Sequence, residues 1–341
     1  MDRQQQQISS KEKLLRKRDK IIWALFLNHA CNLNCGYCYL KNINDDKRMD
    51  RKLLKNVIDR IIYLSKRAGK VPEIGFFGKE PLINFRLLKD ATLYIRESEF
   101  NCGLSVNTNG TLLNTDIIDF LKANNFRIVL SFDFGVSEKN NIQIFDGFNK
   151  DNIDLRTTVC PANLMNIPET VRLCVREGFQ KLSIGFDYSD KGWKKYTYKE
   201  IADVLTESVI VYLKYISRGC RLSVPLFDRI IENGIMRKKW YFSHQPFCRI
   251  GRRIFSIDTN GDVYPCWRFA DDPGFKLGNI VNDFEIEQSR YSIDISTAEK
   301  KNIAGFDYIC YWAYLKKDSA LMNNLKILRA MKMASERISV R

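Results

Sequence analysis

The stretch CNLNCGYC, from Cys31 to Cys38, places three cysteines within eight residues, and it limits the folds open to this chain more than any other feature. It follows the apolar run IIWALFL, which is too short to span a membrane and predicts a buried β-strand over residues 21–27. The fold must therefore hold three thiols in one loop at the carboxyl end of a buried strand. Three clustered thiolates suit a soft metal or an iron–sulfur cluster. Structural zinc usually takes four protein ligands, and the chain has no second C-x-x-C pair; a chance grouping is the remaining alternative.

Short β-branched or aromatic segments alternate with longer amphipathic segments through the first 220 residues. The short segments predict six strands, at 21–27, 73–77, 104–107, 127–132, 154–159 and 182–186. The longer segments predict helices over about 50–67, 82–98, 113–124, 167–177 and 197–217. Successive strand–helix units need right-handed crossovers, so we predict an α/β fold whose parallel sheet forms a partial (β/α)6 barrel.

The pattern changes near residue 220. RRIFSIDTNGDVYPC predicts a β-hairpin that turns at Asn260-Gly261, and a helical tail is expected over about 310–336. We therefore divide the chain into a flexible tip over 1–18, the partial barrel over 19–220 and a small α+β module over 221–341.

Composition and apolar patterning indicate where the protein is located and which partners it can have. No segment is long enough to span a membrane, and no signal-peptide cleavage site follows the first apolar run, so we expect a cytoplasmic protein with no membrane partner. Its cysteines should then be reduced or metal-bound. The formal net charge of +15 could attract acidic partners. Because no basic block is interleaved with aromatic residues, we do not expect a nucleic-acid partner.

Polar and glycine-rich motifs follow the later strands, as the cysteine motif follows the first. They are GFFGKEPL (75–82), NTNGTLL (107–113), SFD (131–133) and RTTVCP (156–161). Sites in β/α sheets form where the strands end, so these motifs should share one rim with the cysteine loop.

Taken together, these motifs make residues 18–190 resemble the radical S-adenosylmethionine (SAM) superfamily. C-x3-C-x2-C with an aromatic residue before the last cysteine resembles the family signature, and GKEP resembles its GGEP motif. The resemblance implies that Cys31, Cys35 and Cys38 hold a [4Fe–4S] cluster whose open iron chelates SAM. Reductive cleavage of SAM would then give a 5′-deoxyadenosyl radical that abstracts hydrogen from the substrate.

The same resemblance implies which residues contact SAM. Glu80 would pair with the SAM ammonium group. The other residues that it places against SAM are Tyr37, Gly78, Lys79, Asn109, Ser131 and Arg156. Lys79 stands where the family has its second glycine, and a positive φ at this position would strain a lysine.

The C-terminal part resembles a SPASM module or the shorter Twitch module. The resemblance rests on Cys248, on DTNGDVYPC ending at Cys266, on LGNI (277–280) and on Cys310. It implies that these three cysteines hold one auxiliary [4Fe–4S] cluster; the alternative is that they are simply buried. Twitch relatives often add a cysteine where this chain has Ala313, so the fourth iron could be open to substrate or bound by another group such as His244.

Three further residues lie near the expected rim. Cys160 could donate a hydrogen atom to a substrate radical, as a lone cysteine does in some radical SAM epimerases, or it could be a buried core residue. Anaerobic sulfatase maturases carry an aspartate base at the position of Trp267, which disfavours that activity. Trp267 and Arg268 could instead line a substrate pocket, or Trp267 could belong to the core.

Two enzymatic functions and one non-catalytic function fit these features. The first, which we prefer, is maturation of a ribosomally synthesised peptide by crosslinking, thioether formation or epimerisation. The second is oxidation or rearrangement of a small molecule such as an aminocyclitol or sugar. Both would need an electron donor such as flavodoxin or ferredoxin. The third is a metal- or nucleic-acid-binding protein with a decayed SAM site, which Lys79 and the net charge suggest and the complete cysteine motif opposes.

Overall fold

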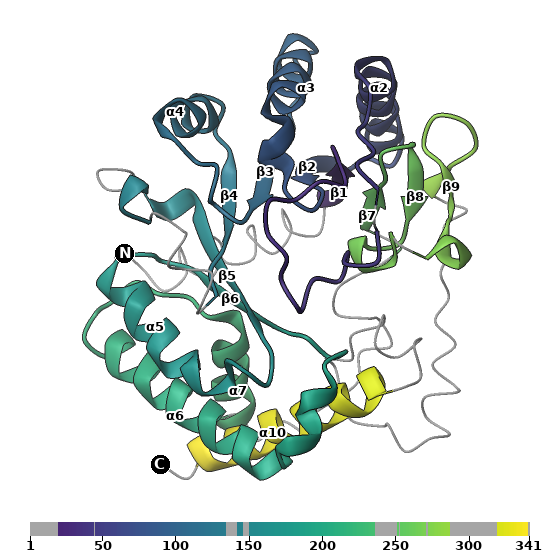
Figure 1. The fold of residues 1–341 in the computed structure, drawn as a ribbon. Coiled ribbons are helices and arrows are strands. Elements are labelled where there is room, and N and C mark those ends of the chain that lie inside the picture. Colours follow the sequence, from purple (N-terminus) through teal and green to yellow (C-terminus); the bar gives the residue numbers. More distant parts are fainter. Residues whose placement is uncertain are drawn as a thin grey trace.

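In the computed structural model, the described residues form one open sheet of nine strands in the order β6-β5-β4-β3-β2-β1-β7-β8-β9 (Figure 1). The structure describes residues 20–43, 45–133, 142–145, 150–235, 251, 253–270, 272–286 and 319–339. The strands are β1 (Lys20–Phe26), β2 (Val71–Phe77), β3 (Gly103–Thr108), β4 (Arg127–Ser131), β5 (Ile153–Val159), β6 (Leu182–Phe186), β7 (Ile254–Ile257), β8 (Asp262–Tyr264) and β9 (Gly278–Asn279). The first six pair in parallel, which confirms the predicted α/β sheet of an open, partial barrel.

Helices follow the strands and pack on the outside of the sheet. They are α2 (Arg51–Arg67), α3 (Phe85–Glu97), α4 (Thr115–Ala123), α5 (Ile167–Arg176) and α6 (Tyr198–Ile216). The first of them shows why these segments are helical. The Asp50 carboxylate caps α2 by accepting from the backbone N–H groups of Lys52 and Leu53, and apolar residues three or four apart turn one face to the core.

The predicted hairpin is present, but it continues the sheet of the barrel. Strand β7 lies parallel to β1, with Ile22 opposite Ile254 and Leu25 opposite Ile257. Strands β8 and β9 then add antiparallel to it. The sheet thus crosses the boundary placed at residue 220, and the division of the chain into domains stays a prediction.

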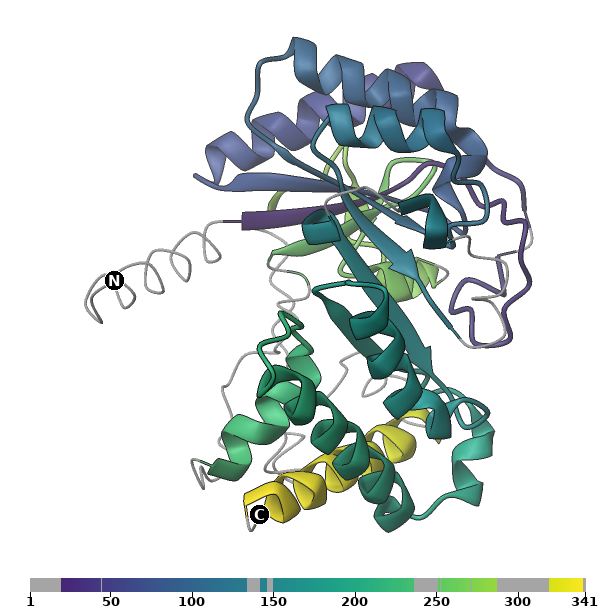
Figure 2. The ribbon, with the colours of Figure 1, turned by 90° about the vertical axis from the view of Figure 1, so that its left-hand side faces the viewer.

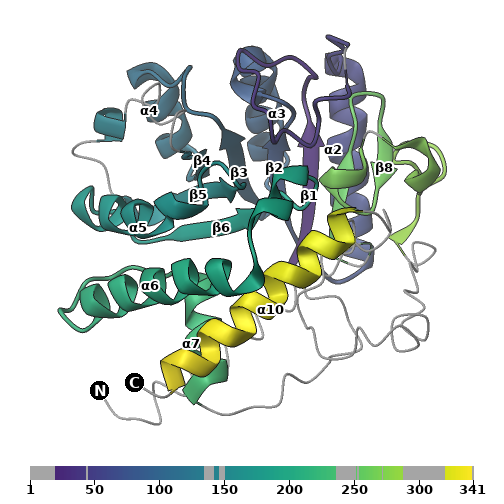
Figure 3. The ribbon, with the colours of Figure 1, turned by 60° about the horizontal axis from the view of Figure 1, so that its bottom comes forward.

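Two more helices pack beside α6, as the side and lower views show (Figures 2 and 3). Helix α7 (Pro225–Ile235) was not predicted. Helix α10 (Ser319–Ser339) was predicted to begin near residue 310, but residues 310–318 lie outside the described part of the chain. The Asn323 side chain ties α10 to the barrel by donating to the carbonyl oxygens of Tyr188 and Asp190, at 2.9 and 3.0 Å. Among the described residues, every helix is too short or too polar to cross a bilayer.

Strand β1 separates two apolar clusters. Because side chains alternate along a strand, Trp23 and Leu25 join the large core under the helices, whereas Ala24 and Phe26 join a smaller cluster on the other face. The smaller cluster also contains Phe77 of β2 and is packed against by the side chains of two cysteines. The inner face of the sheet therefore carries apolar packing directly beside the cysteine loop.

Candidate active site

The three cysteines of CNLNCGYC lie in the loop between β1 and α2, and all three are half-buried. Backbone hydrogen bonds close the base of this loop. The His29 N–H donates to the Lys47 carbonyl at 2.9 Å, and the Met49 N–H donates to the Leu27 carbonyl at 3.1 Å. The loop over residues 28–49, called the cysteine loop below, therefore begins at the carboxyl end of β1 and is closed at its base by backbone hydrogen bonds.

The chemistry of the three thiols fits an iron–sulfur cluster. Burial raises the pKa of Cys31 and Cys35, so their thiolates need a bound cation to persist near neutral pH. The Leu33 N–H and the Asn109 side-chain N–H point to Cys31 Sγ, at 3.4 and 3.9 Å. No three metal-binding side chains of the described residues converge on a single ion position. In a [4Fe–4S] cluster each cysteine binds its own iron, so the three thiols of this loop suit a cluster better than one metal ion.

Glu80 follows β2, and its side chain joins the ends of two strands. It is fully buried, and its carboxylate accepts from the Leu82 N–H at 3.0 Å, the Thr108 hydroxyl at 2.8 Å and the Asn109 N–H at 2.7 Å. Burial raises the pKa of Glu80, while these three hydrogen bonds oppose that effect. Because Asn109 also reaches Asn32 at 3.0 Å, Glu80 and Asn109 connect the strand ends to the cysteine loop.

Gly78 and Lys79 show which position of GKEP needs glycine. Gly78 has φ +135°, and a Cβ there would meet the Asn28 carbonyl oxygen at 2.5 Å. Lys79 is not among the described residues with positive φ, so the expected strain at Lys79 is not found. Its ammonium group instead donates to the Ile43 carbonyl and fastens the cysteine loop to the end of β2.

A second carboxylate, Asp133, was part of the SFD motif but had no predicted role. It accepts from the Tyr37 hydroxyl, from the Thr157 hydroxyl at 2.8 Å and from the Thr158 N–H at 2.8 Å. Burial raises the pKa of Asp133, against these bonds. Asp133 therefore ties Tyr37 of the cysteine loop to strand β5.

Ser131 and Arg156, which were predicted to contact SAM, are neighbours across β4 and β5. Arg156 interacts electrostatically with Tyr39, Arg268 and Cys266, and burial lowers its pKa. Its guanidinium forms no hydrogen bond or ion pair with another described residue. This group is thus placed to receive an anionic ligand.

His29 is a functional candidate that the sequence analysis missed. It is 5% exposed, its Nδ1 faces Asp45 of the cysteine loop, and its Nε2 lies 2.6 Å from Asp258 Oδ1, just after β7. Burial alone would lower the pKa of His29, but the bonds to Asp258 and Asp45 outweigh it and raise the pKa. No local sequence pattern indicates this contact, because Asp258 lies 229 residues after His29.

The C-terminal candidates are only partly described. Cys248, Cys310 and His244 lie outside the described residues. Cys266 is half-buried and, with Cys38, packs against the inner apolar cluster. Tyr39 interacts electrostatically with both thiols, so one predicted auxiliary ligand lies on the same inner face as the cysteine loop.

The structure also describes Trp267, Arg268 and Cys160, the three residues expected near the rim. Trp267 stacks on Phe77 with ring centroids 5.3 Å apart, and Arg268 lies 6.0 Å from the centre of the Tyr39 ring. Cys160 is half-buried just after β5. The suggested roles of these residues in a substrate pocket or as hydrogen donor stay predictions.

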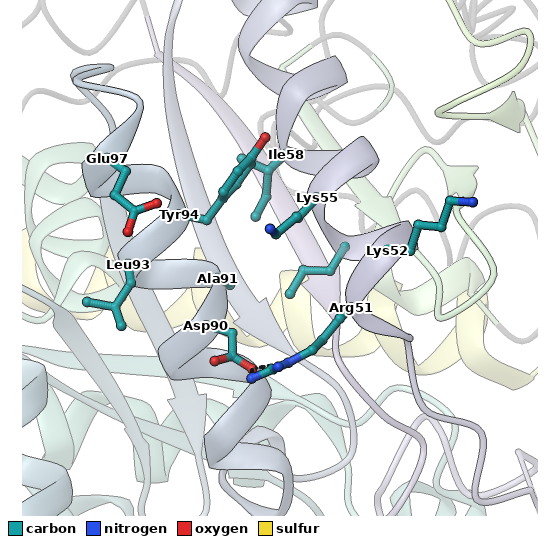
Figure 4. A pocket seen from close by; sticks show the side chains of 10 residues that line it. Arg51, Lys52, Lys55, Ile58, Asp90, Ala91, Leu93, Tyr94 and Glu97 are labelled. Carbon is teal, nitrogen blue, oxygen red and sulfur yellow. Dashed lines mark hydrogen bonds and ion pairs between the residues drawn. The ribbon is translucent and has the colours of Figure 1, made fainter.

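A hollow of about 470 Å³ lies elsewhere, between the outer helices α2 and α3 (Figure 4). Arg51 and Asp90 bridge it as an ion pair, and Lys55 lies over the Tyr94 ring at 5.1 Å. None of the predicted site residues lines it. It therefore lies apart from the candidate active site.

Two family models match the chain. The model of the radical SAM superfamily matches residues 25–142, which include the cysteine loop and the ends of β2 and β3. The model of the SPASM iron–sulfur cluster-binding domain matches residues 248–294, which include β7, β8 and β9.

Individual proteins resemble the chain over different lengths. "Uncharacterized protein MJ0907" of Methanocaldococcus jannaschii is 37% identical over 111 residues, which are 32% of this chain and 37% of that protein. The cysteine-type anaerobic sulfatase-maturating enzyme of Clostridium perfringens is 23% identical over 284 residues, or 74% of this chain and 75% of the enzyme.

Solved structures share the fold. Native anSMEcpe with bound AdoMet and Kp18Cys peptide has a TM-score of 0.65 at 21% identity, over 81% of this chain and 83% of that one. SuiB of Streptococcus suis, bound to precursor peptide SuiA, has a TM-score of 0.60 at 18% identity, over 92% and 78%. The chain therefore shares the fold of these structures, and its residues 25–142 and 248–294 match the models of the radical SAM superfamily and of the SPASM iron–sulfur cluster-binding domain.

Proposed function

We propose that this chain is a radical SAM enzyme that matures a ribosomally synthesised peptide. The observation that carries the proposal is the junction of the cysteine loop with the ends of β2 and β3. There Asn109 holds the Glu80 carboxylate with its backbone and reaches Cys31 and Asn32 with its side chain. Hydrogen bonds thus join the cysteine loop to the ends of β2 and β3, where Glu80 and Asn109 are expected to bind SAM.

Each of the expected site residues has a distinct role in the proposal. Cys31, Cys35 and Cys38 would hold the SAM-binding [4Fe–4S] cluster, which supplies an electron and, with SAM, a 5′-deoxyadenosyl group able to take hydrogen from an unactivated C–H bond. Glu80 would receive the SAM ammonium group while its three hydrogen bonds keep it oriented. Arg156 would bind the SAM carboxylate, because its guanidinium has no competing ion pair among the described residues.

The remaining predicted SAM contacts are positioned by neighbours. The hydroxyl of Tyr37 is held by Asp133, and Ser131 lies beside Arg156 in the sheet. Gly78 brings the end of β2 against the backbone of Asn28. These contacts would orient SAM and keep water from the reacting atoms.

A peptide substrate is supported by what related proteins are named for. The relatives include cysteine-type anaerobic sulfatase-maturating enzymes and the mycofactocin maturase MftC, and both solved structures described above contain peptides. In the proposal, Cys248, Cys266 and Cys310 hold one auxiliary [4Fe–4S] cluster. A small acidic electron carrier such as flavodoxin or ferredoxin would reduce the SAM-binding cluster.

Anaerobic iron and sulfide analysis tests the cluster assignment. Wild type should bind about eight irons, and a Cys31/Cys35/Cys38→Ala variant about four, if both sites hold [4Fe–4S] clusters. The reduced, reconstituted wild type should release 5′-deoxyadenosine from SAM and change the mass of a short peptide encoded beside its gene. A fully loaded protein that releases no 5′-deoxyadenosine would refute the proposed enzyme and favour the non-catalytic function.

A further inference from the structure

His29 connects three segments that are far apart in the sequence. Its backbone N–H closes the base of the cysteine loop on Lys47, and its two ring nitrogens face the carboxylates of Asp45 and Asp258. The two ring nitrogens of His29 thus connect two carboxylates from different segments through one imidazole. The bridge joins both ends of the cysteine loop, at His29 and Asp45, to the turn of the SPASM-matching hairpin.

The sheet register explains why Asp258 can reach His29. Leu25 of β1 lies opposite Ile257 of β7 in a parallel pair, so the chain leaves both strands at the same edge. Asp258 is the first residue after β7, and its side chain is 11% exposed. A hydrogen bond between groups this deeply buried fixes geometry more firmly than an exposed pair does, because water cannot replace either partner.

The backbone of the hairpin does not depend on the Asp258 side chain. Its turn is closed by the Asp258 N–H to the Asp262 carbonyl at 2.8 Å and by the Gly261 N–H to the Asp258 carbonyl at 2.9 Å. The carboxylate accepts a long hydrogen bond of 3.5 Å from the Thr259 hydroxyl within the turn and makes a much shorter contact of 2.6 Å across to His29. The position of an acid at residue 258 is thus explained by the cysteine loop and not by the turn.

We propose that Asp258 is a positioning residue for the SAM-binding cluster: through His29, the SPASM-matching hairpin holds the cysteine loop in the conformation that binds iron. This inference rests on the proposed role of Cys31, Cys35 and Cys38. His29 lies two residues before Cys31, and Lys47 and Asp45 lie in the returning limb of the same loop. Loss of the Asp258 side chain should therefore loosen both ends of the loop that carries the thiols.

Three variants of the reconstituted full-length protein separate this role from general damage. Asp258→Ala removes the bond to His29, and Asp258→Asn keeps an acceptor oxygen of the same shape. Asp262→Ala is the matched control, because Asp262 is in the same hairpin but pairs with Lys276 at 2.8 Å, away from the cysteine loop. The readouts are the EPR spectrum of the reduced cluster with and without SAM, and the rate at which a chelator removes iron.

The expected result is specific to the alanine variant at residue 258. Asp258→Ala should alter the SAM-responsive EPR signal and speed iron loss about tenfold, the lower end of the range for removing a group that directly orients a metal ligand, because Asp258 acts on the ligands only through His29. Asp258→Asn and Asp262→Ala should stay within about twofold of wild type. Equal behaviour of the two alanine variants, changed or unchanged, would overturn the inference while leaving the proposed function intact. A wild type without a SAM-responsive signal would overturn both.

Discussion

Replacing Gly78 with alanine tests whether the end of β2 must touch the backbone of the cysteine loop. Gly78 has φ +135°, and an added Cβ would lie 2.5 Å from the Asn28 carbonyl oxygen. Gly69, just after helix α2, is a matched control: it has φ +60°, but a Cβ there would meet nothing within 4 Å. Both substitutions strain the backbone, and only one also creates a clash.

The expected cost follows from these two differences. Gly69→Ala should lower the free energy of unfolding by about 1–2 kcal/mol, the cost of a left-handed conformation. At Gly78 the backbone strain is about 2–3 kcal/mol, and the side chain can fit only if Asn28 moves. Asn28 donates to the Glu80 carbonyl at 3.1 Å and accepts from the Ala30 N–H at 2.8 Å. Losing these bonds adds about 1 kcal/mol each, so Gly78→Ala should cost about 4–5 kcal/mol in total.

Anaerobic urea unfolding of the two variants and wild type measures these costs, and iron content after reconstitution reports the effect on the cysteine loop. We expect Gly78→Ala to be less stable than Gly69→Ala by about 3 kcal/mol, the difference of the two sums above. It should also bind less iron. If the two variants lost the same stability, the contact with Asn28 would not limit residue 78, and the reasoning would be refuted.

Three other substitutions test separate contacts. Tyr37→Phe removes one donor to the buried Asp133 and should lower the free energy of unfolding by about 1–2 kcal/mol in urea, and an unchanged value would mean that this bond contributes nothing. Lys79→Met removes the hydrogen bond to the Ile43 carbonyl and should lower the free energy of unfolding by about 1 kcal/mol. SAM cleavage should persist, because the backbone at this residue is unstrained. Loss of cleavage in a stable variant would instead give the ammonium group a role in SAM binding. Burial raises the pKa of Cys174 from 9.0 to about 12. Because the pKa is raised in the folded state, the protonated thiol stabilises the fold fully below pH 9, and this contribution is lost as the pH rises toward 12. Between pH 8 and 10, wild type should therefore lose about 1.4 kcal/mol more stability than Cys174→Ala in urea unfolding, and parallel pH curves would contradict the assigned burial.

The strands were predictable because each is a short apolar run ended by a polar or glycine-rich motif. The predicted segment 127–132 and the observed Arg127–Ser131 differ by one residue, and 182–186 is the observed β6. Helix α7 was missed although Pro225 at its first position and Ile230 in its buried face are ordinary signals of an amphipathic helix. It was overlooked because the alternating strand–helix pattern had ended by residue 220.

Contacts between remote segments were not predictable in the same way. Nothing local in the sequence indicates that β7 pairs with β1, because hairpin patterns describe only neighbouring strands. The bridge of His29 to Asp258 depends on that pairing and was missed with it. In contrast, the contact between Glu80 and Asn109 could be expected, since both follow parallel strands whose ends must lie at one edge, whereas their assignment to SAM rested on the family resemblance.

The parallel pairing of β7 with β1 also changes how the C-terminal module relates to the cysteine loop. An independent module would meet the barrel only through a side-chain interface, and its orientation could vary. Here backbone hydrogen bonds join the two parts, including one from the Ile22 N–H to the Arg253 carbonyl at 2.7 Å. Cys38 and Cys266 consequently pack against one apolar cluster on the inner face of that joined sheet. A register shift of one residue would move every side chain of β7 to the opposite face of the sheet and would shift the adjoining hairpin with it. The pairing that brings Asp258 to His29 therefore also keeps Cys266 on the same face as Cys38.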